Sequence, residues 1–582
     1  MSEAASAIHT RVPLPPHIAF ERMNLAGSAL SPEEALERVQ LEPTVLQDFR
    51  PLTSCLEWEL SQLHWNQSGL LPFVENHVPF LINNSGRLSE HAAATLFANC
   101  LDAPGSEPIR VLELGAGTGL FALYFLDAFF TLCKQESKDF YDRLIFYVTD
   151  QSPRTVDQWQ ERHLFDKHGK QRVVLGCCDA LKPSRVVFQT REEVELEGLQ
   201  AVFCNYVLDV LPATVVKKGS NGPEELQVRT HLTRDRGLLT QYTRLTPENI
   251  RDIARSDYSE EKTKLVPLIS LLEIETSFMP LHQESRLLSY ALALDEKTER
   301  VLLNYGAITC LDVCMELLCH TGFILINDYG PVRRDEVANH SVSQRFGPTS
   351  ATGINFPFLE QYFAKKCAVV TPDGDERRGI HSRLMVRSDV PGTVAAYQNR
   401  FGQAGYDFFE VPVEEARAHL SAGRKTESLE SYRLALSRAP HDWHVVGEIA
   451  EFVGLQLQDY QAGRQLIRAA LDQNPWYSAW LWNVLGDILF LDRDVSGAHE
   501  AYLQAQRIHP RDARTNLNLA YTFFEFGEYA NSLEALASAM GADVAGMYRP
   551  RLLEKQHQVL GAISGRWIGE QERLTRRVQR ML

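Results

Sequence analysis

Two patterns of apolar and polar positions divide this chain. From Ile109 onward, short runs rich in β-branched and aromatic residues alternate with longer helical stretches, which is typical of βαβ units and a parallel sheet. We therefore expect an α/β domain with a Rossmann-like, seven-stranded sheet. The predicted strands are Ile109–Leu114, Leu144–Thr149, Arg172–Gly176, Ala201–Asn205 and Gly322–Asn327, followed by a hairpin of Cys367–Val370 and His381–Val386.

Two regions depart from this alternation. Residues 1–100 are interpreted as a polar leader followed by helices, forming an N-terminal lid segment, and the α/β domain is expected over residues 101–395. An insertion of about 80 residues, at about 217–300, separates the fourth and fifth strands. Connections of this length are usually functional, so we expect a lid or a substrate-binding region there.

Beyond Asp389 the pattern is helical only and contains a repeat. Pro440, Pro475 and Pro510 are 35 residues apart, and the helices before Pro440 and Pro510 share the pattern Ala/Ser-x-x-x-Tyr-x-x-Ala. This resembles the tetratricopeptide (TPR) repeat, whose period is about 34 residues. We predict an all-α, TPR-like domain over residues 411–582. It would hold about four units between Val413 and Met540, the second irregular, with Arg551–Leu582 as a cap.

Composition and charge narrow the possible functions. The 582 residues are 44% hydrophobic and 23% charged, which is ordinary for two or three globular domains. The net charge of −16 argues against nonspecific nucleic-acid binding. No apolar run has the length of a membrane span, and the N-terminus does not resemble a secretory signal. All ten cysteines precede residue 368 without a disulfide-like spacing, so we expect a cytoplasmic protein.

The most informative motif follows the first predicted strand. Three glycines, Gly115, Gly117 and Gly119, come after Glu113 and open an apolar helix. Glycines at alternate positions allow a tight turn that approaches a ligand closely. A dinucleotide fingerprint needs its third glycine one position later, where this chain has Leu120. The motif therefore favours S-adenosylmethionine over NAD or FAD.

Acidic residues follow the next strands where such a cofactor needs them. Asp150 ends the second strand and can accept hydrogen bonds from both ribose hydroxyls. Asp179 follows the third strand and can accept from the adenine amino group, while the backbone at Ala180 serves the ring. Glu113 is placed to orient the amino-acid end. For any one of these carboxylates alone, a strand-end cap or a solvated charge is the better interpretation, but three in register favour cofactor binding.

Further motifs carry a resemblance to a known family. The fourth strand continues as Asn205-Tyr-Val-Leu-Asp209-Val-Leu-Pro212, and the fifth ends in Asp328-Tyr-Gly330. Together with the glycine motif, these segments resemble the MidA/NDUFAF7 family of S-adenosylmethionine-dependent methyltransferases, over roughly residues 50 to 388. The resemblance implies a class I methyltransferase fold, and for the mitochondrial branch a protein arginine as acceptor.

The chain departs from the family pattern at several positions. Tyr206 stands where the family has Glu, and Asn355 where it tends to have Asp. The basic loop expected after Asp-Tyr-Gly is only loosely matched by Arg333-Arg334 and by Gln344-Arg345-Phe346. These differences weaken the inference that this chain shares the family's substrate, but they do not weaken the inference that it shares the cofactor.

Candidate catalytic residues lie beside the expected methyl position. Asp209 is the first candidate for steering a cationic acceptor and taking its proton, and Asn205 would supply a side-chain carbonyl. Capping of the next helix is an equal alternative for Asp209. Asp328 is a second candidate, for which a structural role is the better interpretation. Cys310 and Cys314 share a helical face, but we interpret them as apolar packing and expect no metal.

These observations predict a methyltransferase that modifies a protein side chain such as arginine and whose TPR-like repeats bind a protein or peptide. One alternative is a catalytically idle assembly or scaffold protein that keeps the fold. Another is a small-molecule methyltransferase whose helical domain dimerises. No nucleic-acid or membrane partner is expected, and the basic amphipathic end, with Arg573, Arg576, Arg577 and Arg580, is interpreted as a capping helix or a docking site. The oligomeric state is left open.

Overall fold

The computed structural model describes residues 10–11, 44–75, 86–188, 190–281, 287, 300–339, 344–346, 348–402, 410–543 and 546–581. The chain forms two compact units; among the described residues, those up to Gly402 belong to the first unit and those from Glu410 onward to the second. Within the described ranges, no helix combines the length and the apolar character that crossing a bilayer requires.

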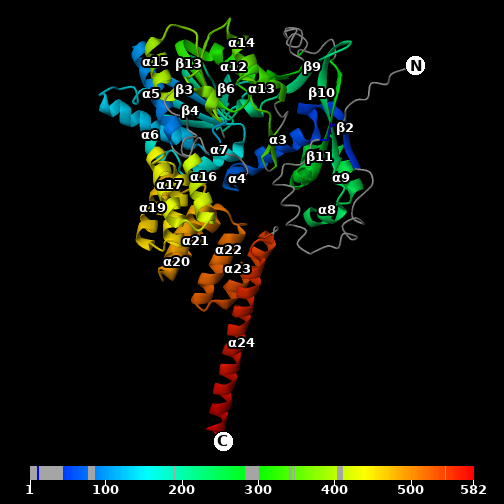
Figure 1. Ribbon diagram of the computed structural model, residues 1–582, viewed down its shortest axis with the longest axis vertical. Helices are drawn as coiled ribbons and strands as arrows, with labels where there is room; N and C mark the ends of the chain where they lie inside the picture. The colour runs from blue at the N-terminus through cyan, green and yellow to red at the C-terminus, as the bar shows by residue number, and fades with distance from the viewer. Residues whose placement is uncertain are drawn as a thin grey trace, which may run out of the picture. The chain divides into compact units, whose positions relative to one another are not determined.

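The first unit is built on a nine-stranded sheet in the order β16-β17-β13-β8-β3-β4-β5-β6-β7 (Figure 1). Five central strands run parallel, and the β16–β17 hairpin is antiparallel to them. The seven predicted strands are all present, as β3 (Ile109–Leu114), β4 (Leu144–Asp150), β5 (Val173–Cys177), β8 (Leu199–Asn205), β13 (Leu318–Asp328), β16 (Ala368–Val370) and β17 (His381–Val386). The doubly wound α/β fold is therefore confirmed.

Two short strands extend the predicted sheet at one edge. They are β6 (Arg185–Val187) and β7 (Glu193–Glu195), which pair with each other and with the end of β5. The expected strand number of seven is therefore too low. Three residues per strand, several of them charged and exposed, are too few to show an alternation in the sequence.

Helices cover both faces of this sheet. On one face α6 (Leu120–Gln135) packs Phe121 and Phe125 against Phe203 of β8, with α5 (Arg87–Asp102) and α15 (Pro391–Phe401) beside it. On the other face, α12 (Tyr305–Leu317) and α14 (Phe356–Phe363) share a buried cluster with alternate residues of the strands. Because both faces are covered, the strands are nearly continuous apolar runs.

The predicted insertion forms part of a second, six-stranded sheet. Strands β9 (Thr214–Gly219), β10 (Gly222–Leu232) and β11 (Leu272–Pro280) come from the insertion, and β12 (Arg300–Leu303) follows it. Between β10 and β11 lie three short helices, α8 (Arg236–Tyr242), α9 (Pro247–Ala254) and α10 (Ser259–Lys262). The remaining strands are β1 (Thr10–Arg11) and β2 (Thr44–Pro51), and β2 pairs with β10.

We expected only helices after the polar leader of the N-terminal region. This region also contributes a strand, because β2 belongs to this sheet. Helices follow it, as α3 (Leu56–Ser68), α4 (Leu71–Val74) and α5. A buried ion pair joins α3 to the hairpin of β14 (Gln344–Phe346) and β15 (Thr349–Ala351). Arg345 Nε donates to Glu57 Oε1 at 2.7 Å, and Ser350 Oγ donates to the same oxygen at 2.8 Å. Arg345, compared above with a basic family loop, thus serves the fold.

The second unit consists of four antiparallel helix pairs and a long final helix. The pairs are α16 (Glu410–Ser421) with α17 (Lys425–Arg438), α18 (Trp443–Glu451) with α19 (Tyr460–Gln473), α20 (Ala479–Leu491) with α21 (Val495–Ile508), and α22 (Ala513–Glu525) with α23 (Tyr529–Ala542). This confirms the TPR-like repeats. The second pair is irregular, as predicted, because α18 continues as a π-helical turn at Phe452–Gln456. The final helix is α24 (Arg549–Gln579).

Candidate active site

The glycine turn lies between β3 and α6 and is closely enclosed. The turn contains three glycines with positive φ values, which residues other than glycine rarely adopt. The values are 62° for Gly115, 52° for Gly117 and 75° for Gly119. A Cβ at Gly117 would lie 2.8 Å from the Phe73 ring of α4, and one at Gly115 would lie 2.8 Å from Val207. Trp159 Nε1 donates to the Gly117 carbonyl at 2.9 Å and fixes the turn.

Asp150 lies at the carboxyl end of β4, next to this turn. Its Oδ2 accepts from the Gly117 amide at 3.1 Å and its Oδ1 from the Ser152 amide at 2.9 Å. A carboxylate oxygen accepts two hydrogen bonds, so Asp150 keeps capacity for two hydroxyl groups. Burial raises the pKa of Asp150 to about 6, against these opposing amide hydrogen bonds.

Asp179 and Ala180 follow β5, the next strand along the same edge. Asp179 is exposed, and its Oδ1 accepts from the Leu181 amide at 2.9 Å. Ala180 is half-buried against the core of the sheet. The ends of β3, β4 and β5 therefore bring Glu113, Asp150 and Asp179 to one edge, as predicted from their positions in the sequence.

A chain of buried polar side chains crosses four adjacent strands at this edge. Asn205 of β8 donates to Glu113 Oε1 at 3.2 Å and accepts from Asn327 of β13 at 2.8 Å. Ser382 of β17 donates to Asn327 at 2.7 Å. Asn205 thus orients Glu113, and its side-chain carbonyl accepts a hydrogen bond inside the sheet. We had expected that carbonyl to face the substrate that receives the methyl group.

Among these hydrogen-bonded side chains, Glu113 has an oxygen atom without a partner in the described segments. Its Oε2 is buried and has no hydrogen-bond partner among the described residues. Burial raises the pKa of Glu113 to about 8, with the Asn205 hydrogen bond opposing the shift and Asp150 adding to it. A buried acceptor without a partner costs free energy, so this oxygen is suited to receive a hydrogen-bond donor from a ligand.

Asp209 lies in the turn that follows β8, on the short helix Leu208–Val210. Two amides of this turn, those of Leu208 and Asp209, donate to Asp328 Oδ2, each at 3.2 Å. Asp328 also accepts from the Tyr329 amide at 2.9 Å. Asp328 is therefore the anchor of the turn, in agreement with the structural role that the sequence favoured for it.

The Asp209 side chain itself does not anchor the turn. Its Oδ1 is buried and accepts no hydrogen bond within the limits of the described chain. Burial raises the pKa of Asp209 to about 6, against the opposing effect of the neighbouring Tyr329 hydroxyl. The capping role considered for Asp209 falls to Asp328, and Asp209 is left with a buried oxygen available to a ligand.

Two aromatic residues flank this turn. Tyr206 has a φ of 50°, which is uncommon for a residue with a side chain, and such strain is concentrated at functional sites. The rings of Tyr206 and Tyr329 have centroids 6.4 Å apart. Tyr206 occupies the position where the family resemblance implied Glu, so this part of the site is more aromatic than expected.

Sequence reasoning missed the residues that enclose the glycine turn. Phe73 and Trp159 reach it from α4 and from α7 (Pro153–Glu161). Neither belongs to a motif, and nothing in their spacing signals the contact. Tyr329 could have been found, because it lies inside the Asp-Tyr-Gly segment.

Other singled-out residues serve the fold. Asn355 caps α14 by accepting from the Phe358 amide at 3.2 Å, and exposed Arg333 pairs with Asp335 and Glu336. Cys310 and Cys314 are buried in the apolar cluster beneath the sheet. The described part of the chain contains no group of three or more side chains placed to hold a metal ion.

Comparison with known proteins agrees with this geometry. Residues 93–352 match the model of a family described as "Putative S-adenosyl-L-methionine-dependent methyltransferase". None of the curated proteins matches the chain. The match includes the glycine turn, the ends of β4 and β5 and the Asp209 turn, and it confirms the resemblance inferred from the motifs.

Solved structures similar to the chain are distant from it. One is a protein of Burkholderia thailandensis described as a "likely methyl transferase" bound to S-adenosyl-homocysteine, with 15% identity, coverage of 63% of this chain and 82% of that chain, and a TM-score of 0.36. An uncharacterized protein of the same organism has 13% identity, coverage of 66% and 97%, and a TM-score of 0.38. Pseudomonas aeruginosa PilF has 14% identity, coverage of 30% and 79%, and a TM-score of 0.23.

The residues present fit S-adenosylmethionine. The turn leaves no space for a Cβ, Glu113 has a buried oxygen without a partner, and Asp150 keeps acceptor capacity where a ribose is expected. The family match and this donor set together define an S-adenosylmethionine-dependent methyltransferase.

Proposed function

We propose that the first unit methylates a nitrogen atom of a basic protein side chain, with arginine as the first acceptor to test. We further propose that the helical repeats recruit the protein that carries it. Attachment of a peptide-binding array to a transferase raises the effective concentration of a bound polypeptide at the active site.

The observation that carries the proposal is the buried carboxylate of Asp209. Its unpaired Oδ1 lies in the turn after β8, where the Tyr329 hydroxyl neighbours the carboxylate and the Tyr206 ring lies 6.4 Å from the Tyr329 ring. A buried carboxylate is suited to a cationic nitrogen, which gains a charge-assisted hydrogen bond there. A neutral hydroxyl acceptor would use Asp209 only as a base, whereas a cationic nitrogen also gains from its negative charge on binding.

The roles of the residues follow from this arrangement. When bound, S-adenosylmethionine supplies an electrophilic methyl group on a sulfonium. Asp150 and Glu113 would hold its ribose and its amino group. Asp209 would orient the acceptor nitrogen and accept the proton that leaves as the new carbon–nitrogen bond forms. Asp328 keeps the turn rigid, which matters because misalignment is costly in a displacement reaction.

The repeats offer a surface suited to a polypeptide. Asn518 of α22 donates to Asn483 of α20 at 3.1 Å, and Arg514 bridges Glu451 at 3.2 Å and Asp487 at 2.7 Å. Asn483 and Asn518 are 35 residues apart, at equivalent positions of successive repeats. Asn483 is buried and uses its amide inside the array, whereas Asn518 and Arg514 are partly exposed, so the polar surface that we propose for a polypeptide is marked by these two side chains.

The test is transfer of a labelled methyl group from S-adenosylmethionine to proteins of a lysate, followed by identification of the labelled residue. Asp209→Asn should lower the turnover number by about 10²- to 10⁴-fold and change the cofactor dissociation constant by less than about threefold. Asp252→Asn, at an exposed carboxylate of α9, is the matched control and should leave both values unchanged.

The pH dependence gives an independent check. Because the ionised form of Asp209 accepts the proton, the wild-type rate should rise as the pH increases through about 6. If the label appears only in small molecules, the acceptor is a metabolite and not a protein. Cofactor binding without any methyl transfer would instead favour the idle scaffold.

A further inference from the structure

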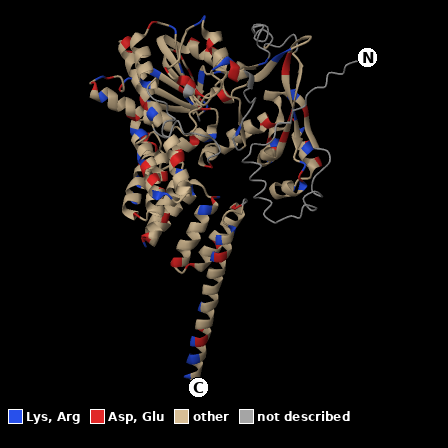
Figure 2. Cartoon of the chain, viewed as in Figure 1, with Lys and Arg blue, Asp and Glu red and all other residues tan. Residues whose placement is uncertain are grey.

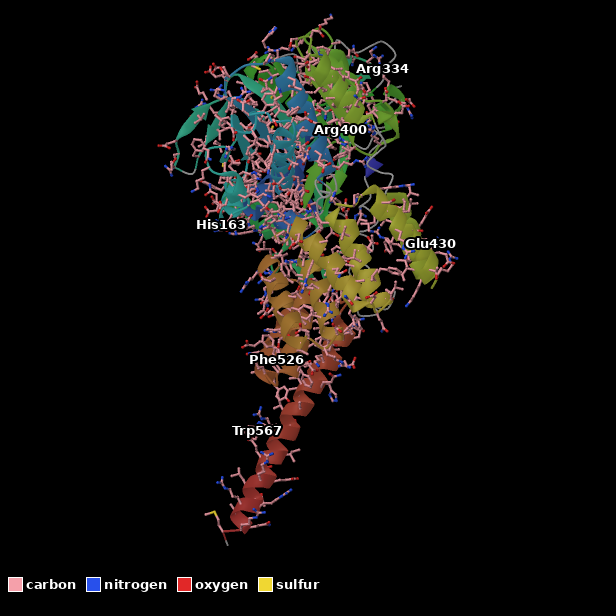
Figure 3. The ribbon with its side chains drawn as sticks, turned by 90° about the vertical axis from the view of Figure 1, so that its left-hand side faces the viewer. His163, Arg334, Arg400, Glu430, Phe526 and Trp567 are labelled. Carbon is pink, nitrogen blue, oxygen red and sulfur yellow. The ribbon has the colours of Figure 1, made fainter. Side chains whose placement is uncertain are left out.

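The last helix of the second unit, α24, has two different halves. In its first turns Leu552, Lys555 and Val559 are buried, and Lys555 Nζ lies 3.8 Å from the centroid of the Phe524 ring of α22. Beyond Val559 the helix runs clear of the repeats (Figures 1 and 3), and Trp567, labelled in Figure 3, is 72% exposed. Only the first half therefore caps the array, although the whole segment was expected to do so.

The exposed half carries an apolar stripe. Its members are Leu560, Ile563, Trp567, Leu574, Val578 and Met581. Their successive spacings are 3, 4, 7, 4 and 3 residues, which place all six on one face of a helix with 3.6 residues per turn. Met581 is 85% and Leu574 61% exposed, so this face is open within the described chain.

Such a helix is not stable by itself. Gly561, Gly565 and Gly569 lie within it, and a Cβ at any of them would meet no atom within 4 Å. A glycine in an exposed helix costs about 1 kcal/mol relative to alanine, so the three together cost about 3 kcal/mol. Most helix stability in proteins comes from packing of an apolar face, and this half lacks such packing.

The order of the stripe indicates what covers it. The spacings read the same from either end, so the stripe is its own complement when two helices run in opposite directions. A second copy placed antiparallel brings Leu560 opposite Met581, Ile563 opposite Val578, and Trp567 opposite Leu574. We propose that the chain forms a twofold symmetric dimer through antiparallel pairing of residues 560–581, which comprise the exposed half of α24 and the turn after it. A symmetric pair contact of this kind is the commonest way in which proteins form dimers.

The charges beside the stripe neither drive nor prevent this pairing. The segment carries five arginines and two glutamates, and blue Arg positions mark the end of α24 in Figure 2. In the antiparallel register, Glu570 comes opposite Gln571 of the second copy, so the two Glu570 carboxylates lie near each other beside the twofold axis, which is repulsive. Arg566 comes near Arg577 of the second copy, which is repulsive, and both pairs are open to solvent, where such interactions are weak. The apolar stripe therefore determines the association.

The size of the contact sets the expected affinity. A pairing of 22 residues is about 33 Å long. Six apolar side chains from each copy form an interface near the lower end of the range for specific contacts, for which we expect a micromolar dissociation constant. The dimer does not depend on the methyl acceptor, so it can be tested independently of the proposed function.

The first test is sedimentation velocity of the full chain from about 1 to 200 µM, a range that spans the expected dissociation constant. The wild type should shift from monomer to dimer. The double variant Trp567→Ser/Leu574→Ser should weaken dimerisation by at least about tenfold, because it removes one apolar pair on each side of the twofold axis. Met547→Ser, at a residue 74% exposed before α24, is the matched control and should dimerise as the wild type does.

The second test determines the direction of the helices. Trp567→Cys mixed with Leu574→Cys should form a disulfide between copies, beyond the level seen with the wild type. Cross-linking of Trp567→Cys with itself instead would indicate parallel helices and overturn the proposal. A wild type that stays monomeric at the highest concentration would also overturn it. So would a monomer that binds vesicles containing phosphatidylserine through the same stripe.

Discussion

Replacement of Glu113 by Gln tests the role of the buried carboxylate beside the glycine turn. Gln keeps the shape of Glu, and its oxygen can accept the same hydrogen bond from Asn205. The substitution removes the ability to ionise and replaces the acceptor Oε2 by an NH2 donor. If Glu113 receives the amino group of the cofactor, binding of that cation must convert the carboxyl from its protonated to its ionised form, and a proton must be released.

The number of protons follows from the pKa. Burial raises the pKa of Glu113 from an ordinary 4.5 to about 8, so at pH 7 the free site holds about 0.9 proton. A cation next to the carboxyl favours the ionised form and lowers this pKa, so up to about 0.9 proton leaves on binding. Asp150, whose burial raises its pKa to about 6, holds only about 0.1 proton at pH 7 and contributes little.

Isothermal titration calorimetry measures this exchange. S-adenosyl-homocysteine is titrated at pH 7 in phosphate and in Tris, which differ in ionisation enthalpy, and the difference in heat gives the protons released. Glu113→Gln should release about 0.1 proton or less under the same conditions. Glu107→Gln, at an exposed carboxylate before β3, should behave like the wild type.

Two results would refute this reasoning. Release of less than about 0.2 proton by the wild type would mean that Glu113 does not ionise on binding. Equal release by the wild type and by Glu113→Gln would assign the proton to another group. In either case the unpaired oxygen of Glu113 would not be the site of the amino group.

Two further substitutions test the turn and the frame around it. Gly117→Ala adds a Cβ 2.8 Å from the Phe73 ring at a φ of 52°. The affinity for S-adenosyl-homocysteine, measured by calorimetry, should therefore fall by at least about tenfold. Gly541→Ala, whose Cβ would meet no atom within 4 Å, is the control and should leave the affinity unchanged. Arg345→Met leaves Glu57 charged and buried without its partner and should lower the free energy of unfolding by about 3–5 kcal/mol in urea denaturation. Glu57→Met combined with Arg345→Met should restore most of this loss; a double variant as unstable as the single one would contradict the ion-pair explanation.

The sequence predicted the parts of the fold that depend on local patterns. The strands of the central sheet were found to within a few residues because both faces are buried and their apolar runs are continuous. The repeats were found because Pro440, Pro475 and Pro510 recur at a constant spacing. In each case the information lies within about 35 residues of chain.

The second sheet was missed because its pairing is distant. Val228 of β10 pairs with Arg50 of β2 and with Thr276 of β11, and no local pattern relates these three segments. The site shows the same division. Glu113, Asp150 and Asp209 were found from strand-end positions, whereas Phe73 and Trp159 reach the glycine turn only through tertiary packing.

The pairing of β2 with β10 has a consequence for any shortened form of the protein. A chain that starts at residue 101, where the α/β domain was expected to begin, would lack β2 and leave part of one edge of β10 open to intermolecular association. It would also lose the carboxylate that neutralises Arg345 and the ring that shields Gly117. The catalytic body therefore includes residues that precede its recognisable motifs, and biochemical work on the transferase requires the chain from at least Thr44.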